Sequence, residues 1–477
     1  MGARPGWVVA RAAYRLTMMP NTAAGRVRRS RVAAAALAIV VLVIATAQVL
    51  GPFAPGPISA ALPTSGAAAQ TGSPAPIGSP VVGAPAASGR VGASGSGGLA
   101  ASPASPSPVS LATQLQDVLD RARAKDSIPG VSVAILWDDG RSWVGASGLR
   151  NVATADPMTT GTAFALASVS KTFTAAVVLE LVQEGKLALD QSVAPLLPAF
   201  GLDRRITVRM LLDHTSGLPD FFLGKGVDEA LLEDTGATWT ASESWGYVAK
   251  KHAVPGTTWA YSNTNYLLLG QLVTAITGRS LAWEVRTRLL NPLGLSTAYY
   301  QAAETPREAG AVAYLLLPGS GGGWVAKPVA PASDVMPFRS VVTAAAGAGS
   351  MAATALDAAR WMRAWAGGQV LSPGMQAQML ADIARTVRLH AAIPYGLGIQ
   401  RVTLNGYSAL GHSGRYLGMR DVVRYLPAAG VTIAVLTNQS LYDPSQIASA
   451  LLNVVLPIPT PTATPNQVPT ASATAHP

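Results

Sequence analysis

The stretch FALASVSKTFTAAVV, residues 164–178, decides both the expected fold and the expected chemistry of this chain. It places a Ser-x-x-Lys motif, Ser168 to Lys171, at the head of a helical run that continues to Glu184. Residues three apart at the start of a helix lie on one face, a turn from each other. A serine hydroxyl needs a base within reach, and a partly desolvated lysine has the lowered pKa for that task. The stretch, the one Ser-x-x-Lys in the chain, therefore predicts a nucleophilic Ser168 activated by Lys171.

A second motif, Tyr261-Ser262-Asn263, lies in PGTTWAYSNTNYLLLG, between a Pro-Gly turn and an apolar helical run. A tyrosine there can relay a proton between nucleophile and leaving group, and an asparagine can donate a hydrogen bond to a substrate amide. It is the one Tyr-x-Asn in the chain. Taken alone, the motif is more typical of a buried tyrosine beside a capping asparagine, so its meaning depends on the other motifs.

A third motif, Gly411-His412-Ser413-Gly414, falls on a predicted strand. The edge of a strand beside a nucleophile can offer backbone N–H groups as an oxyanion hole, and its side chains can hold a substrate carboxylate or carbonyl. The neighbouring motifs favour this role for His412. The isolated His214, in LLDHTSGLPD, is interpreted as structural.

Charge and composition exclude several classes of function. The chain has 477 residues and a net charge of +10, but residues 1–116 contain eight arginines and no Asp or Glu. The rest of the chain is close to neutral, so a nucleic-acid partner is not expected. There is no cysteine, which excludes disulfides and thiolate metal sites, and the five histidines form no HExxH pair. No metal and no cofactor is expected.

The two ends of the chain differ from its middle. Residues 1–31 form a basic leader, and 32–51 an uncharged stretch long enough to span a membrane as a helix. The leader arginines should stay cytoplasmic and send the rest outward, which predicts an extracytoplasmic protein. A retained signal anchor is preferred for 32–51, with a cleaved signal peptide as the alternative. Residues 52–110, rich in Pro, Gly, Ser and Ala, and 458–477, rich in Pro and Thr, are expected to be disordered.

Residues 111–457 have the texture of one folded domain. Strands are expected at both of its ends and helices between them, which predicts one sheet assembled from both ends plus a helical lobe. The expected strands are 131–137, 141–147, 407–413, 420–426 and 431–437, and the expected helices are 111–124, 171–184, 207–214, 266–277, 282–290, a helix capped at Thr354 and running to Trp365, and 444–455.

The order and spacing of the three motifs resemble the serine β-lactamase and penicillin-binding-protein superfamily. Within it, the chain is most similar to the class C β-lactamase-related group of D-alanyl-D-alanine carboxypeptidases, D-aminopeptidases and esterases. The resemblance covers residues 111–457 and implies the α/β (α+β), β-lactamase/transpeptidase-like fold of that family. Further segments resemble the family in its order: IPGVSVAIL, VRMLLDHTSGLPD, NPLGLSTAYY, YGLGI and GHSGRYLGM.

The resemblance also implies roles for residues. Ser168 would form an acyl-enzyme, while Lys171 and Tyr261 would share the acid and base work. Asn263 would position the substrate amide. The backbone N–H groups of Ser168 and Arg415 would form the oxyanion hole.

The strand that bears His412, Ser413 and Gly414 would bind substrate, and His412 stands where many relatives have lysine. Because histidine is largely neutral at pH 7, the substrate either lacks the carboxylate that such a lysine binds, or Arg415 restores the cation.

These implications predict an extracytoplasmic serine hydrolase, anchored to the bacterial cell membrane or secreted, that acts on a peptide, amide or ester. A cell-wall peptide is one candidate substrate. Two alternatives stay open. One is a β-lactamase proper, and the other is a catalytically silent relative that binds cell-wall peptides or a protein partner. The intact Ser168, Lys171 and Tyr261 favour catalysis.

Overall fold

The computed structural model describes residues 109–307, 309–318, 323–331 and 333–456. The predicted leader (1–31), membrane segment (32–51), nearly all of the spacer (52–110) and the tail (458–477) lie outside the described residues, so these assignments stay predictions. No helix within the described ranges is both long and apolar enough to cross a membrane.

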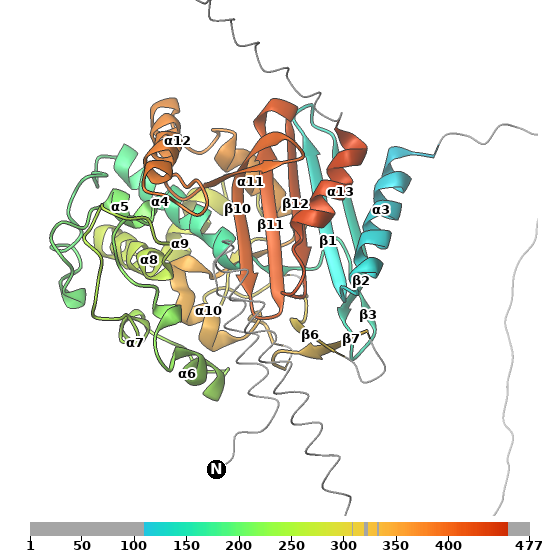
Figure 1. The fold of residues 1–477 in the computed structure, drawn as a ribbon, viewed down its shortest axis with the longest axis horizontal. Coiled ribbons are helices and arrows are strands. Elements are labelled where there is room, and N and C mark those ends of the chain that lie inside the picture. The colour runs from blue at the N-terminus through green and yellow to red at the C-terminus, as the bar shows by residue number, and fades with distance from the viewer. Residues whose placement is uncertain (1–108, 308, 319–322, 332, 457–477) are drawn as a thin grey trace, which may run out of the picture. The chain divides into compact units, whose positions relative to one another are not determined.

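Seven antiparallel strands form the central sheet in the order β3-β2-β1-β12-β11-β10-β9 (Figure 1). The N-terminal strand β1 pairs along its length with the C-terminal strand β12, with Val131 opposite Thr437. This pairing confirms the prediction of one sheet assembled from both ends of the domain. The strands are β1 Gly130–Trp137, β2 Ser142–Asn151, β3 Asp156–Pro157, β9 Gln400–Leu404, β10 Tyr407–Tyr416, β11 Met419–Leu426 and β12 Val431–Thr437.

The two central strands are buried on both faces. Every residue of β1, GVSVAILW, and of β12, VTIAVLT, is buried. A strand covered on both sides tends to be apolar throughout rather than alternating, and both segments consist largely of apolar residues.

One face of the sheet is covered by two amphipathic helices, α3 (Leu111–Lys125) and α13 (Ser445–Val455), which we call the outer layer. The two helices also pack against each other. Beneath them, Leu115, Leu119 and Leu451 are fully buried among apolar residues of the sheet. This side of the sheet is a small hydrophobic core, separate from the larger one.

The opposite face of the sheet is covered by α11 (Ala355–Ala366), and the helical lobe lies next to this helix (Figure 1). We call α11 and the helical lobe together the inner layer. Its core helix is α4 (Ser170–Gln183), of whose 14 residues 11 are buried. A helix buried all round is a core helix. The remaining elements are α5 Val208–Leu212, α6 Val227–Glu233, α7 Ala241–Trp245, α8 Asn263–Thr277, α9 Leu281–Val285, α10 Arg339–Ala345, α12 Pro373–Arg388, the small sheet of β4 Phe164–Ala165, β8 Met351–Ala353 and β5 Tyr299–Tyr300, and the hairpin of β6 Tyr314–Pro318 and β7 Trp324–Pro328.

The predicted elements are found where the sequence places them, with shifts of a few residues at their ends. The helix expected over 282–290 is divided, because α9 ends at Val285 and a π-helical turn, Arg286–Leu290, follows it. The strand expected over 407–413 continues to Tyr416, so the whole third motif and Arg415 lie on one strand.

Candidate active site

Ser168 lies in a short 3₁₀ turn, Ala167–Val169, which leads directly into α4. The residue before it, Ala167, has a φ of +43°, a left-handed conformation that costs free energy for a residue other than glycine. This turn holds Ser168 partly exposed while the residues on either side are buried. Lys171 follows one turn later, and its Nζ lies 3.1 Å from Ser168 Oγ.

The Lys171 side chain is fully buried and has three hydrogen-bond partners. Besides Ser168 Oγ, its Nζ donates to Asn263 Oδ1 at 2.7 Å and to the Ala348 carbonyl at 2.9 Å. Burial lowers the pKa of Lys171 to about 7, and the nearby Asp220 carboxylate opposes part of that shift. A lysine with this pKa can take the proton of Ser168 near neutral pH.

Tyr261 completes the group around the nucleophile. Its hydroxyl is within hydrogen-bonding reach of Ser168, and Lys171 Nζ lies 5.0 Å from the centre of its ring. Burial raises the pKa of Tyr261 well above its usual value, so the phenol keeps its proton and can donate it. Lys171, rather than Tyr261, is therefore the group able to act as the first base.

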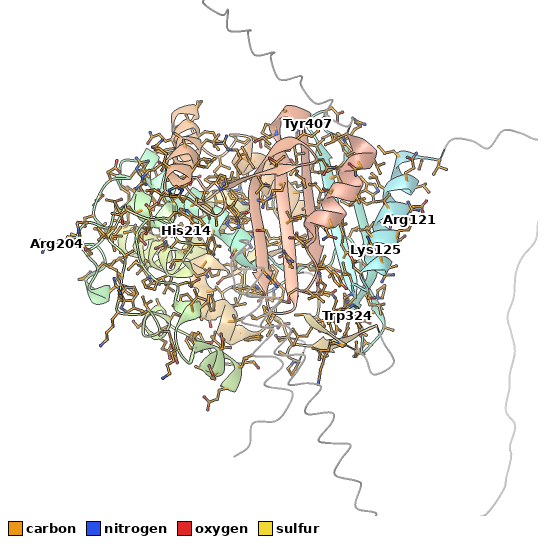
Figure 2. All side chains as sticks on the ribbon, viewed as in Figure 1. Arg121, Lys125, Arg204, His214, Trp324 and Tyr407 are labelled. Carbon is orange, nitrogen blue, oxygen red and sulfur yellow. The ribbon has the colours of Figure 1, made fainter. Side chains whose placement is uncertain are left out.

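His214 supports the loop that carries Tyr261, from inside the helical lobe (Figure 2). Its Nδ1 accepts a hydrogen bond from the Ser262 backbone N–H at 3.2 Å, and its ring lies 4.4 Å from that of Tyr261, measured between centres. Its backbone carbonyl accepts from the Ala260 N–H. Burial lowers the pKa of His214 well below its usual value, so the ring is neutral. These contacts fit the structural role that the sequence suggested.

Asp220 is a site residue to which the sequence analysis gave no role. Asn263 Nδ2 donates to its Oδ2 at 2.7 Å, so Asn263 joins Lys171 on one side to Asp220 on the other. Its Oδ1 accepts from the Phe222 N–H, which caps a short 3₁₀ turn. Burial raises the pKa of Asp220 to about 6, although the residue as a whole is only half-buried.

Strand β10 lies beside the nucleophile because of Gly414. A Cβ at this position would stand 2.3 Å from the Leu166 carbonyl oxygen, so only glycine allows the strand to approach this closely. The Ser413 N–H donates toward Gln400 on the β9 side of the strand. The backbone N–H of Arg415, two residues further along β10, points to the same side of the strand. The pairing of β9 with β10 ends at Gly411, before the strand reaches Arg415.

The side chains of β10 divide between the two faces of the sheet. Successive side chains of a strand alternate, so His412 and Gly414 face the inner layer, while Ser413 and Arg415 face the opposite way. Ser413 Oγ lies 3.4 Å from Gln400 Oε1, and Arg415 Nη2 donates to the Ser440 carbonyl at 3.0 Å. The structure therefore brings the backbone of these two residues, but not their side chains, toward the nucleophile.

His412 is fully buried, with both ring nitrogens in hydrogen bonds. Its Nδ1 lies 2.7 Å from the Ser413 carbonyl, which can only accept, so Nδ1 carries the proton. Its Nε2 is then free to accept from the Tyr395 hydroxyl at 2.9 Å. Burial lowers the pKa of His412 well below its usual value. Its ring stands 6.4 Å from that of Tyr261, where it supports the tyrosine as a neutral group.

The structure thus gathers Ser168, Lys171, Tyr261 and Asn263 at one place, with the β10 strand alongside. Asp220 and Tyr395 were missed, although both lie in segments that resemble the family, VRMLLDHTSGLPD and YGLGI. A signal for Asp220 was its place before Phe221 and Phe222, where a carboxylate caps a turn. No group of three or more His, Asp or Glu residues in the described part of the chain is placed to hold a metal ion.

A family model described as "Beta-lactamase" matches residues 115–454. The chain belongs to the β-lactamase family. The match covers the whole described domain apart from a few residues at its ends, and it confirms the family inferred from the three motifs. Members of this family are serine hydrolases, and this chain is therefore an enzyme of the β-lactamase and penicillin-binding-protein type.

Curated relatives within the family have several activities. Penicillin-binding protein 4 of Amycolatopsis lactamdurans is 32% identical over 340 residues, which cover 68% of this chain and 84% of that protein. A D-aminopeptidase of Brucella anthropi is 28% identical over 70% of this chain and 60% of its own length. Esterase EstB of Burkholderia gladioli is 34% identical over 42% of this chain and 54% of its own length.

Solved structures of the family confirm the fold. The D-amino acid amidase of Ochrobactrum anthropi SV3 aligns with a TM-score of 0.61 at 23% identity, over 72% of this chain and 98% of that one. A D-stereospecific amidohydrolase from Streptomyces aligns with a TM-score of 0.58 at 27% identity, over 72% and 98% of the two chains. The mixed fold of antiparallel sheet and helices predicted from the sequence is thus confirmed.

Proposed function

We propose that this protein forms an acyl-enzyme on Ser168 and hydrolyses a peptide, amide or ester outside the cytoplasm. The observation that carries the proposal is the buried Lys171 Nζ, 3.1 Å from Ser168 Oγ and held there by Asn263 and Ala348. An amine with a lowered pKa at this distance is what a serine nucleophile requires. The same three contacts argue against a silent relative, because the catalytic arrangement is complete.

Acylation follows from the arrangement of these groups. Lys171 Nζ takes the proton of Ser168 as its Oγ attacks the substrate carbonyl, and a C–O bond forms. The backbone N–H groups of Ser168 and Arg415 stabilise the oxyanion. When the tetrahedral intermediate collapses, the bond to the leaving group breaks. Tyr261, protonated and next to Ser168, delivers a proton to the leaving nitrogen or oxygen and recovers one from Lys171.

Deacylation uses the same groups in reverse roles. A water molecule takes the place of the leaving group and gives a proton to the Tyr261 and Lys171 pair as it attacks the acyl carbon. The ester bond to Ser168 then breaks, and the proton returns to Oγ. The products are the free acid and the regenerated enzyme, so no cofactor is required for either half-reaction.

The neutral state of His412 supports substrates that lack a carboxylate beside the leaving group. Both of its ring nitrogens are already hydrogen-bonded, and the Arg415 side chain faces the other side of β10. The relatives named D-aminopeptidase and D-amino acid amidase fit this reading better than a carboxypeptidase does. We therefore propose amides, esters or peptides of D-amino acids as the acyl donors.

The proposed location rests on the sequence alone. Residues 32–51 would hold the enzyme at the cell membrane, and residues 52–110 would extend the domain away from it. Mass analysis of the N-terminus of the mature protein distinguishes a retained anchor from a cleaved signal peptide.

Labelling of the nucleophile tests the proposed chemistry. Intact protein is treated with a fluorophosphonate, and the modified peptide is identified by mass spectrometry. One added group on Ser168 is expected, with none on Ser168→Ala. We expect Ser168→Ala to lose hydrolysis of p-nitrophenyl butyrate by a factor on the order of 10⁴ or more while keeping its melting temperature. Wild-type turnover by Ser168→Ala would overturn the assignment.

A further inference from the structure

The backbone on either side of Tyr261 is held by His214. The N–H of the residue before the tyrosine, Ala260, donates to the His214 carbonyl at 3.0 Å. The N–H of the residue after it, Ser262, donates to His214 Nδ1 at 3.2 Å. The rings of His214 and Tyr261 lie 4.4 Å apart, measured between their centres. The position of the phenol relative to Ser168 therefore depends on the position of His214.

His214 has a backbone conformation that its surroundings must maintain. Its φ is +65°, in the left-handed region, which costs free energy for a residue other than glycine. Such a conformation persists only where the surrounding contacts determine it. The residue is fully buried, and the Nδ2 atom of Asn265 lies 3.2 Å from its Nδ1. The segment on either side of His214 is fixed by contacts with a distant helix.

Arg385, on α12, contacts both residues that flank His214. Its Nη1 forms an ion pair with Asp213 Oδ2, and its Nη2 donates to Thr215 Oγ1 at 3.2 Å. The N–H and the hydroxyl of Thr215 both donate to Asp213 Oδ1, at 3.0 and 2.6 Å. Asp213 and Thr215 are fully buried. One guanidinium group, 172 residues further along the chain than Asp213, therefore connects the two neighbours of His214 to α12.

The ion pair of Arg385 with Asp213 is suited to fixing geometry. Burial raises the pKa of Asp213 to about 6 and the charge of Arg385 opposes that rise, so the carboxyl is largely ionised at neutral pH. A buried carboxylate requires its partner, because an unpaired charge in this position is strongly unfavourable. The planar guanidinium also presents its N–H groups at fixed angles, so it holds two acceptors in a defined arrangement.

The next residue of α12, Thr386, leads to the same group of rings. Its Oγ1 donates to the Tyr395 carbonyl at 2.7 Å and accepts from the Tyr395 N–H at 3.1 Å. The Tyr395 ring lies 4.7 Å from that of His214, and its hydroxyl is 2.9 Å from His412 Nε2. Two consecutive residues of α12 thus connect this helix to the rings that surround Tyr261.

We propose that Arg385 is a positioning residue for the proton relay through Tyr261. It holds the two neighbours of His214, and His214 in turn holds the two neighbours of Tyr261. This inference rests on the proposed function, in which Tyr261 delivers a proton to the leaving group. Arg385 acts through other residues, so its loss should slow the steps that need this proton more than those that do not.

Two substrates with the same acyl group separate this role from a loss of stability. The leaving nitrogen of D-phenylalanine p-nitroanilide needs a proton, whereas the p-nitrophenyl ester of D-phenylalanine releases nitrophenolate without one. We measure kcat/KM, which reports acylation, for both substrates with full-length protein. The ester-to-anilide ratio should rise at least about tenfold in Arg385→Gln, because a misplacement of about 1 Å can cost about 10²-fold. A smaller folded fraction would lower both values equally and leave the ratio unchanged.

Arg286→Gln is the matched control. The side chains of Arg286 and Arg385 have the same exposed fraction, 25%, but Arg286 pairs with Glu304 instead, so its variant should keep the wild-type ratio. Arg385→Lys keeps the charge but not the planar group, and its ratio should lie between those of the wild type and Arg385→Gln. Asp213→Asn/Arg385→Met leaves no unpaired buried charge, and it should show the raised ratio even if Arg385→Gln does not fold.

A double-mutant cycle tests whether Arg385 acts through Tyr261. Tyr261→Phe alone should raise the ratio, and Arg385→Gln should change it by less than about twofold further in that background. An unchanged ratio in the folded Arg385 variants, or effects of the two substitutions that simply multiply, would overturn the positioning role. A wild type in which Ser168 is not labelled by a fluorophosphonate would instead overturn the proposed function.

Discussion

The two faces of the central sheet are covered by helices of different character. In the outer layer, α3 and α13 bury leucines such as Leu115 and Leu451 and turn their polar residues to solvent. In the inner layer, α4 buries polar side chains together with apolar ones. Thr172 donates to the Val169 carbonyl and Thr174 to the Gly347 carbonyl.

The outer layer mainly stabilises the fold, whereas the inner layer holds the groups of the proposed reaction. Burial of leucine stabilises the fold through the hydrophobic effect, and such a layer has no need of precise polar contacts. Burial of Lys171 costs free energy, but it lowers the pKa of the amine, as the proposed role of Lys171 as a base requires. The inner layer can hold this group because Asn263 and the Ala348 carbonyl satisfy it. The predictions below test whether the two layers are separable in this way.

Removal of the inner-layer amine should have the largest effect. We expect Lys171→Ala to lower kcat/KM for p-nitrophenyl butyrate by a factor on the order of 10⁴ or more, because Ser168 loses its base. Lys186→Ala is the control, since that lysine is exposed and paired with Glu184. A loss of less than about tenfold in Lys171→Ala would mean that another group deprotonates Ser168.

Tyr261→Phe should have a smaller effect. The variant keeps the ring that packs on His214 and removes only the proton relay, so a fall in kcat of about 10²- to 10⁴-fold is expected. The loss should be greater for an anilide than for a p-nitrophenyl ester, because nitrophenolate leaves without a proton. Tyr425→Phe, whose hydroxyl contacts Asp138 instead, is the control. Equal losses with both substrates would argue against the relay.

The pH dependence of the wild type tests the state of Lys171. In the proposed mechanism the neutral amine is the active form, so kcat/KM for the ester should rise with pH, about tenfold per unit below a pKa of about 7, and level off above it. The Asp220 carboxylate raises the pKa of Lys171, so Asp220→Asn should move this limb to lower pH. His214 and His412, which also face Lys171, stay neutral through this range. A limb that moves to higher pH in Asp220→Asn would contradict the account.

Truncation in the outer layer should leave turnover intact. Leu451 is fully buried between α13 and the sheet, and Leu451→Ala should reduce the free energy of unfolding by about 2–5 kcal/mol. Thermal or urea denaturation measures this loss, and kcat/KM is then compared at a temperature where both proteins are folded. A marked fall in kcat/KM of the folded variant would show that the outer layer also positions the site.

The sequence predicted the architecture and the chemical motifs better than it predicted the surroundings of each side chain. Strands β1 and β12 consist largely of apolar, β-branched residues, and the Ser-x-x-Lys spacing places two side chains on one face of a helix, so both are local signals. The contact of Asn263 with Asp220 joins residues 43 positions apart, and that of Tyr395 with His412 depends on how a loop returns to the sheet. Such contacts have no periodicity and arise only from tertiary packing.

The His412 strand illustrates the same limit. The motif and its strand were predicted from the sequence. Which of its side chains face the inner layer follows from their alternation along β10 in the structure. The exact strand bounds mattered here, because the strand continues unbroken through Arg415. A β-bulge at Ser413 would have turned the Arg415 side chain to the other face of the sheet. The residue types in this segment do not indicate whether a bulge is present.

The pairing of β1 with β12 has a consequence for biosynthesis. The ribosome completes β1, β2 and the Ser168 helix early, but β10, β11 and β12 emerge only near the end of the domain. Until then β1 has a partner along one edge only, and the strand that flanks the nucleophile is missing. We therefore expect no activity before the last strands are made, because a chain that stops before Val431 has Ser168 without a complete sheet to support it.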